Sequence, residues 1–134
     1  MMARRADPLP LVYSCSGCSS AAQMANFLAV QLDREGVAEM SCIVGVGGGV
    51  KKLVRIAQSG RPILAIDGCA LECVASCLRQ AGVEPTEHVL LSTHGVPKRY
   101  HADFNPSEAH VVLEGLRGKA RGLAAQSTED SPAQ

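Results

Sequence analysis

The sequence contains no tryptophan and very few other aromatic residues. Two tyrosines and two phenylalanines make up 3% of the 134 residues, whereas 46% of the chain is hydrophobic. A core built from such a chain has to be aliphatic. The sequence also lacks an excess of either charge, since 13 basic residues balance 13 acidic ones. It therefore offers no overall attraction to nucleic acid or to an anionic membrane, and it indicates no protein partner.

Long apolar runs are absent as well. No stretch approaches the roughly 18 apolar residues that a membrane-spanning helix needs. The first residues, MMARRADP, lack the apolar region that is typical of a signal peptide. We therefore expect a cytoplasmic protein. The length fits one domain, which would bury about two-thirds of the surface that the unfolded chain exposes.

Cysteine, in contrast, is frequent. In a small secreted protein six cysteines would indicate disulfides, but in a reducing cytoplasm clustered cysteines are more typical of metal or redox chemistry. We therefore expect a metal or cluster site. The six residues are Cys15, Cys18, Cys42, Cys69, Cys73 and Cys77.

Short apolar stretches alternate along the chain with helical stripes, which are sets of apolar residues spaced so that they lie on one face of a helix. Strands are predicted at 9–14, within 37–46, at 63–66 and at 89–92. Helices are predicted by four stripes with i, i+3, i+4, i+7 spacing: Ala25/Leu28/Ala29/Leu32, Val50/Leu53/Val54/Ala57, Leu71/Val74/Ala75/Leu78 and Ala109/Val112/Leu113/Leu116. This order predicts a single three-layer α/β domain, with a four-stranded, mostly parallel sheet and helices on both faces. The domain is expected to span residues 9–117, between a flexible N-terminus (1–8) and a disordered tail (118–134).

The predicted topology brings most of the cysteines to one place. Cys15 and Cys18 follow the first strand, Cys42 lies within the second, and Cys69 and Cys73 follow the third. The carboxyl ends of parallel strands lie at the same edge of a sheet. A tetrahedral zinc site built from thiolates needs about four sulfur ligands. The sequence therefore predicts a zinc site made by these five residues.

Other interpretations apply to single residues. Burial as a small hydrophobic side chain within the strand is an equally good interpretation of Cys42. Cys77 lies one helical turn beyond Cys73, away from the sheet edge, and is interpreted as a structural or exposed thiol. Asp67 is expected either to cap the helix that follows or to hydrogen-bond a metal ligand.

A glycine-rich stretch, Gly45-Val-Gly-Gly-Gly49, invites comparison with dinucleotide-binding loops, and Asp67 lies at roughly the right distance downstream. However, Val50 occupies the third glycine position, and the stretch follows the second strand instead of the first. We interpret these glycines as residues that let the backbone approach the cysteine site closely.

Three of these segments resemble a known family. Tyr13-Ser-Cys-Ser-Gly-Cys-Ser19, Met40-Ser-Cys-Ile-Val-Gly45 and Ile66-Asp-Gly-Cys69 with Cys73 are similar to the DGC domain, a small bacterial family named after its Asp-Gly-Cys motif. The likeness covers roughly residues 9–100. It implies metal binding, described for the family on the strength of four shared cysteines, and no known reaction. By position these four are Cys15, Cys42, Cys69 and Cys73, with Cys18 as a frequent fifth.

The expected function is therefore zinc binding by cysteine thiolates at the carboxyl edge of a parallel sheet, in a sensing or carrier role. Two alternatives use the same cysteines. One is a thiol redox or persulfide-handling enzyme, and the other is an iron–sulfur protein.

Overall fold

Four strands form one fully parallel sheet in the order β2-β1-β3-β4. The computed structural model of the protein describes residues 8–130. β1 and β3 lie at the centre and every residue in them is buried, which matches their continuous apolar sequences. The strands are β1 (Leu11–Ser14), β2 (Glu39–Met40), β3 (Ile63–Asp67) and β4 (Glu87–Leu90).

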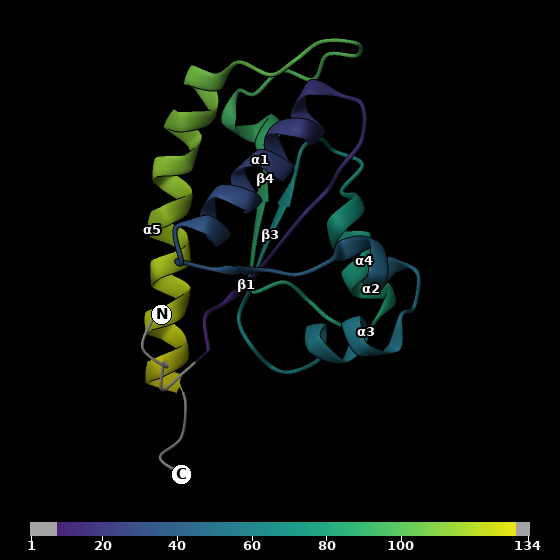
Figure 1. Ribbon diagram of the computed structural model, residues 1–134, viewed down its shortest axis with the longest axis vertical. Coiled ribbons are helices and arrows are strands. Elements are labelled where there is room, and N and C mark those ends of the chain that lie inside the picture. Colours follow the sequence, from purple (N-terminus) through teal and green to yellow (C-terminus); the bar gives the residue numbers. More distant parts are fainter. Residues whose placement is uncertain (1–7, 131–134) are drawn as a thin grey trace.

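Helices cover both faces of this sheet (Figure 1). α1 and α5 pack against each other and both contact β3, whereas α4 contacts β3 and packs against α2, which in turn contacts α3. The predicted three-layer α/β fold is confirmed. The helices are α1 (Ser20–Arg34), α2 (Ile43–Gly47), α3 (Lys51–Ala57), α4 (Cys73–Gln80), the 3₁₀ helix η1 (Leu91–His94) and α5 (Pro106–Asp130).

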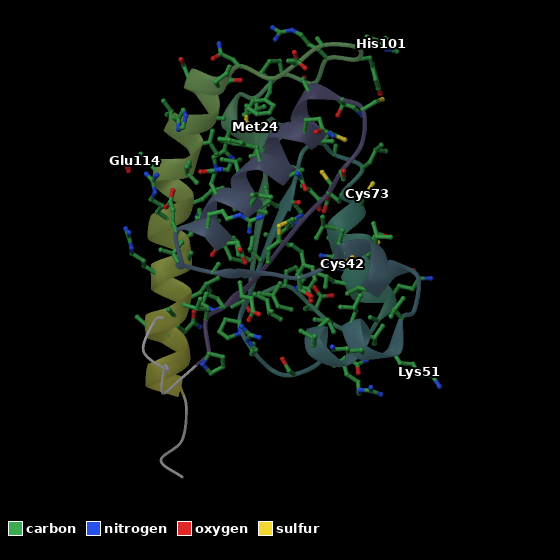
Figure 2. All side chains as sticks on the ribbon, in the orientation of Figure 1. Met24, Cys42, Lys51, Cys73, His101 and Glu114 are labelled. Carbon is green, nitrogen blue, oxygen red and sulfur yellow. The ribbon has the colours of Figure 1, made fainter. Side chains whose placement is uncertain are left out.

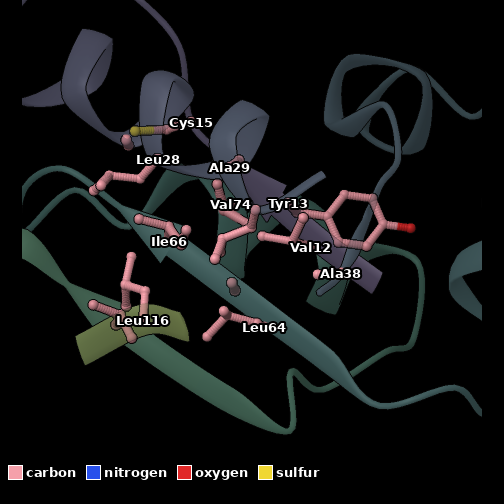
Figure 3. Packing of buried hydrophobic residues seen from close by; sticks show 14 of the residues in the cluster. Val12, Tyr13, Cys15, Leu28, Ala29, Ala38, Leu64, Ile66, Val74 and Leu116 are labelled. Atoms are coloured by element: carbon pink, nitrogen blue, oxygen red, sulfur yellow. The ribbon is translucent and has the colours of Figure 1, made fainter. Parts of the chain in front are cut away.

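The core is aliphatic, as the composition predicts, with Tyr13 and Met24 as its large exceptions. Figure 3 shows Tyr13 among the aliphatic side chains. The two phenylalanines, Phe27 and Phe104, pack together at the edge of the core with ring centroids 5.3 Å apart. Along residues 8–130, no helix combines the length and apolar character needed to cross a membrane.

The strand order creates a switch point between the two central strands. The chain leaves β1 through α1 toward β2 on one side, and it leaves β3 through α4 toward β4 on the other. The loops that follow β1 and β3 therefore diverge to opposite faces and leave a crevice between them, where α/β proteins bind their ligands. Residues 15–19 and 68–72 form these two loops.

The second strand is much shorter than the apolar run 37–46 suggests. β2 contains two residues, and Cys42 lies beyond it as the N-cap of α2. The prediction that Cys42 is inside a strand is therefore wrong. Likewise α4 begins only at Cys73, so Leu71 precedes the helix and is 72% exposed.

The last helix is longer than predicted. α5 continues to Asp130, so the prediction of a disordered tail is wrong for residues 118–130. Ala120 and Leu123 extend the buried stripe of Leu113 and Leu116 at spacings of four and three, and this apolar face packs on the domain. The rest of the predicted tail, and the predicted flexible N-terminus apart from Pro8, lie outside the described residues.

Candidate cysteine site

The loops after β1 and β3 bring four cysteines around one cavity. The backbone N–H of Cys15 donates to the carbonyl of Ile66 at 3.1 Å, so the ladder between the central strands continues up to the first thiol. The cavity has a volume of about 230 Å³. Its wall includes Cys15, Cys18, Cys69 and Cys73.

Cys15 lies at the buried end of this cavity, beside α1 (Figure 3). Its Sγ accepts a hydrogen bond from the backbone N–H of Gly68 at 3.2 Å. Burial raises the pKa of Cys15 to about 11, and the bond from Gly68 only partly opposes that shift. Near neutral pH Cys15 is therefore a protonated thiol unless a metal ion displaces its proton.

The aspartate of the Asp67-Gly68-Cys69 sequence caps α4. Asp67 is 1% exposed. Its Oδ1 accepts from the N–H of Val74 at 2.8 Å and its Oδ2 accepts from the N–H of Ala75 at 3.2 Å. These bonds satisfy donors that the start of a helix leaves free. The predicted capping role of Asp67 is confirmed.

Gly68 allows the loop after β3 to press against α1. A Cβ at this position would lie 2.8 Å from the carbonyl carbon and oxygen of Ala21 and 2.9 Å from the nitrogen of Ala22. These are backbone atoms of a helix and cannot move aside easily. A side chain is thus excluded at the residue whose backbone N–H reaches the sulfur of Cys15.

His88 supports the same loop from the neighbouring strand. Its Nε2 lies 2.8 Å from Asp67 Oδ2, and its Nδ1 lies 3.7 Å from Glu72 Oε1. Glu72 directly precedes α4 and adopts a left-handed conformation with φ of 55°. No sequence motif indicates this role for His88, because its partner lies 21 residues earlier, on β3.

Lys98 reaches the cavity from a distant segment. Its Nζ donates to the Sγ of Cys69 at 3.3 Å and lies 5.2 Å from the ring centroid of Tyr100. Two hydrogen bonds raise the pKa of Lys98, mainly the one with Tyr100 and, to a smaller extent, the one with Cys69. The ammonium therefore stays charged beside the thiol of Cys69. No motif in the sequence indicates this contact.

The segment that carries Lys98 is tied to the start of α1 by Ser20. The Oγ of Ser20 donates to the carbonyl of Pro97 at 3.3 Å and accepts from the N–H of Arg99 at 2.9 Å. The N–H of Ser20 donates to the carbonyl of Arg99 at 2.8 Å. These three bonds place Lys98 over the cavity.

The remaining two cysteines lie outside the 230 Å³ cavity. Cys42 is exposed, and its Sγ accepts from the N–H of Gly45 at 3.4 Å at the start of α2. Cys77 is half-buried and lines a smaller cavity of about 170 Å³ together with Cys15 and Cys73. A Cβ at Gly47 would lie 2.8 Å from the Sγ of Cys77. The glycine thus permits a close approach to a thiol, although not to one of the five predicted ligands.

The four thiols around the cavity are suitable zinc ligands in kind and number. Within residues 8–130, however, no three cysteine, histidine, aspartate or glutamate side chains already lie together as ligands of one metal ion. A closed site would require side chains to move. Cys18 and Cys73 are exposed, so their rotation is not opposed by packing. Figure 2 shows the position of Cys73.

We expect the reduced, metal-free protein to lose stability as the pH rises from about 9 to about 11. In this range Cys15 ionises in the unfolded chain, where its pKa is 9.0, but stays protonated in the folded protein, where burial raises its pKa to about 11. Proton loss therefore favours unfolding, and the contribution of the buried thiol is complete below the lower value and lost above the higher one. Urea unfolding of the wild type and Cys15→Ala across this range measures the effect. Cys18→Ala, which removes an exposed thiol, is the control; a parallel decline of the wild type and Cys15→Ala would contradict the assignment.

Comparison with known proteins identifies the family. The family model described as the DGC domain matches residues 11–116. The chain is also 60% identical over 113 residues to the "Anaerobic and virulence modulator AnvM" of Pseudomonas aeruginosa, which covers 82% of this chain and 86% of that protein. No solved structure matches the chain. The family match spans both loops of the cysteine cavity, and the chain therefore belongs to the DGC domain family.

Proposed function

We propose that this protein is a regulatory zinc-binding protein and that the thiolates of Cys15, Cys18, Cys69 and Cys73 hold the ion. The observation that carries the proposal is the cavity at the switch point, which these four cysteines line together. Cys15 and Cys18 lie in the loop after β1, whereas Cys69 in the loop after β3 and Cys73 at the start of α4 follow more than fifty residues later in the sequence. Zinc binding would therefore tie β1 to β3 and α4.

Two groups beside the cavity would stabilise a negatively charged thiolate cluster and oppose the cost of burying Cys15. A zinc ion with four thiolates has a net charge of −2, and such sites are stabilised by donors to the sulfurs. Two donors are already in place: the N–H of Gly68 at Cys15 and the ammonium of Lys98 at Cys69. When bound, zinc would supply a fixed, redox-inactive centre that keeps Cys15 deprotonated despite its burial.

The regulatory role rests on similarity. The name of the relative from Pseudomonas aeruginosa describes a modulator and names no reaction. The exposed thiols of Cys18 and Cys73 leave the site open to solvent, which suits a site that gains or loses its ion.

A thiol redox protein is the second candidate, and the contact of Lys98 with Cys69 favours it. A neighbouring ammonium stabilises negative charge on sulfur, and the thiolate is the nucleophile in thiol–disulfide exchange. The same cysteines serve both candidates. Bound zinc would protect them from alkylation, whereas a redox thiol would react rapidly.

Elemental analysis of protein purified without added metal tests the proposal. We expect about one equivalent of zinc per chain, because thiolate zinc sites bind tightly enough to survive purification. Iodoacetamide should react slowly with this protein and faster after chelation. Less than about a tenth of an equivalent of zinc, together with rapid alkylation of the untreated protein, would contradict zinc binding and favour a thiol redox protein instead. A visible absorption band after anaerobic purification would instead indicate an iron–sulfur cluster.

A further inference from the structure

A second cavity lies within the helical layer formed by α2, α3 and α4. It has a volume of about 560 Å³, within the range of small-molecule sites. Three consecutive glycines, 47–49, form one side, and Gln80 and Ala81 at the end of α4 form another. No cysteine lines it. Lys51, the first residue of α3, lines this cavity, and Figure 2 shows it away from Cys73.

Two cations face this cavity, Lys51 and Arg55. Lys51 and Arg55 lie four residues apart on α3, so both occur on one side of the helix. Within residues 8–130, neither side chain makes an ion pair or hydrogen bond, whereas Arg61, Arg79 and Arg117 are each paired with a glutamate.

The charge around the cavity is unbalanced in the sequence as well. Between Glu39 and Asp67 the chain contains four basic residues and no acidic one. Among the residues that the structure describes, none of those lining the cavity is acidic. Local positive potential therefore persists here although the whole chain is neutral.

The rest of the lining suits an organic molecule more than a bare ion. Val46 and Val54 provide an apolar surface. Gln58 donates through Nε2 to the carbonyl of Ala81 at 3.0 Å, which leaves its amide oxygen available as an acceptor. The glycines carry no side chains, so a ligand can approach the backbone closely there.

We propose that this cavity binds a small organic anion, no larger than a nucleoside monophosphate, through a phosphate or carboxylate group held by Lys51 and Arg55. The guanidinium of Arg55 offers paired N–H donors that match either group. The ammonium of Lys51 adds a second charge on the same side. The valines and the glutamines contact the remainder of the molecule.

Titration of the full-length, reduced protein with AMP, inorganic phosphate or succinate tests the proposal. We expect at least one of them to bind with a Kd below about 1 mM at low ionic strength. Shifts in ¹⁵N–¹H NMR spectra should map to residues 46–58 and 80–81. Binding of AMP and phosphate would assign a phosphate ligand, binding of succinate alone a carboxylate, and AMP binding more tightly than phosphate a contribution from the organic part. Adenosine, which lacks the charge, should not bind.

Lys51→Ala and Arg55→Ala should each weaken binding about tenfold, since each removes a direct charged contact. Lys52→Ala is the matched control, because Lys52 is the adjacent exposed lysine and does not line the cavity. It should change affinity by less than about twofold. Equal weakening by Lys52→Ala would show that the anion is held by a diffuse positive surface and would contradict the site. A Kd above about 1 mM for all three anions would also overturn it.

Discussion

Replacing Cys15 with serine is expected to lower the affinity for zinc by at least about 100-fold, or about 2.7 kcal/mol. The substitution removes one of the four sulfur ligands. Its effect on zinc affinity should exceed the roughly 10- to 100-fold loss that follows when a group supporting a ligand is removed. Cys69→Ser and Cys73→Ser should have effects of similar size. Competition with a chromophoric chelator measures these affinities.

Two further variants and the exposure of Cys73 make the result specific. Cys77→Ser is the matched control, because Cys77 lies one turn after Cys73 on the same helix and does not line the 230 Å³ cavity. Cys42→Ser distinguishes the ligand set that the sequence predicts from the set around the cavity, and we expect it to keep most of the zinc affinity. Cys73→Ser alters an exposed side chain and therefore keeps the fold, so its loss of zinc cannot be assigned to unfolding. Full zinc binding by Cys15→Ser and Cys73→Ser would contradict the proposed ligands.

The largest effect on stability is expected for Asp67→Ala, at about 3 to 5 kcal/mol in the free energy of unfolding. The substitution removes a fully buried carboxylate and leaves three groups without their acceptor: the N–H groups of Val74 and Ala75 and the ring of His88. Each buried donor left unpaired costs about 1 to 3 kcal/mol, although partial exposure of His88 reduces its share. Urea unfolding of the metal-free protein measures the difference.

The same chemical change at the surface provides the control. Asp103 is exposed, and Asp103→Ala should alter the free energy of unfolding by less than about 0.5 kcal/mol. Asp67→Asn keeps one acceptor oxygen and should fall between the two. A cost below about 1 kcal/mol for Asp67→Ala would show that α4 is held by packing alone and that the cap is dispensable.

The predictions for Cys42 and for the C-terminal tail are wrong because the local sequence pattern and the three-dimensional packing disagree. A short apolar run such as 37–46 is compatible with either a strand or a buried helical segment. Here its second half turns into α2, and Cys42 becomes a cap instead of a core residue. The prediction of a disordered tail is wrong for another reason. Its many small residues make the apolar repeat through Ala120 and Leu123 difficult to recognise in the sequence. Contact with the domain stabilises a helix that composition alone does not favour.

Lys98 and His88 were missed because their partners are distant in the chain. The contact of Lys98 with Cys69 spans 29 residues, and that of His88 with Asp67 spans 21. Neither spacing repeats a helical or strand period, so no local pattern indicates it. Only the pairing of β3 with β4, and the three bonds that tie the segment 97–99 to Ser20, bring these side chains to the loop after β3.

The sequence by itself determined the alternation of strands and helices, the aliphatic core and the edge of the sheet at which the cysteines gather, because periodicity and parallel topology dictate these features. The tertiary structure alone decided which thiols share a cavity, which of them is buried and which lies beside a positively charged side chain. The physical reason is that burial and side-chain direction depend on contacts between segments far apart in the chain. Gly68 illustrates both: the Asp-Gly-Cys motif marks it in the sequence, but only its approach to α1 explains why no side chain fits there.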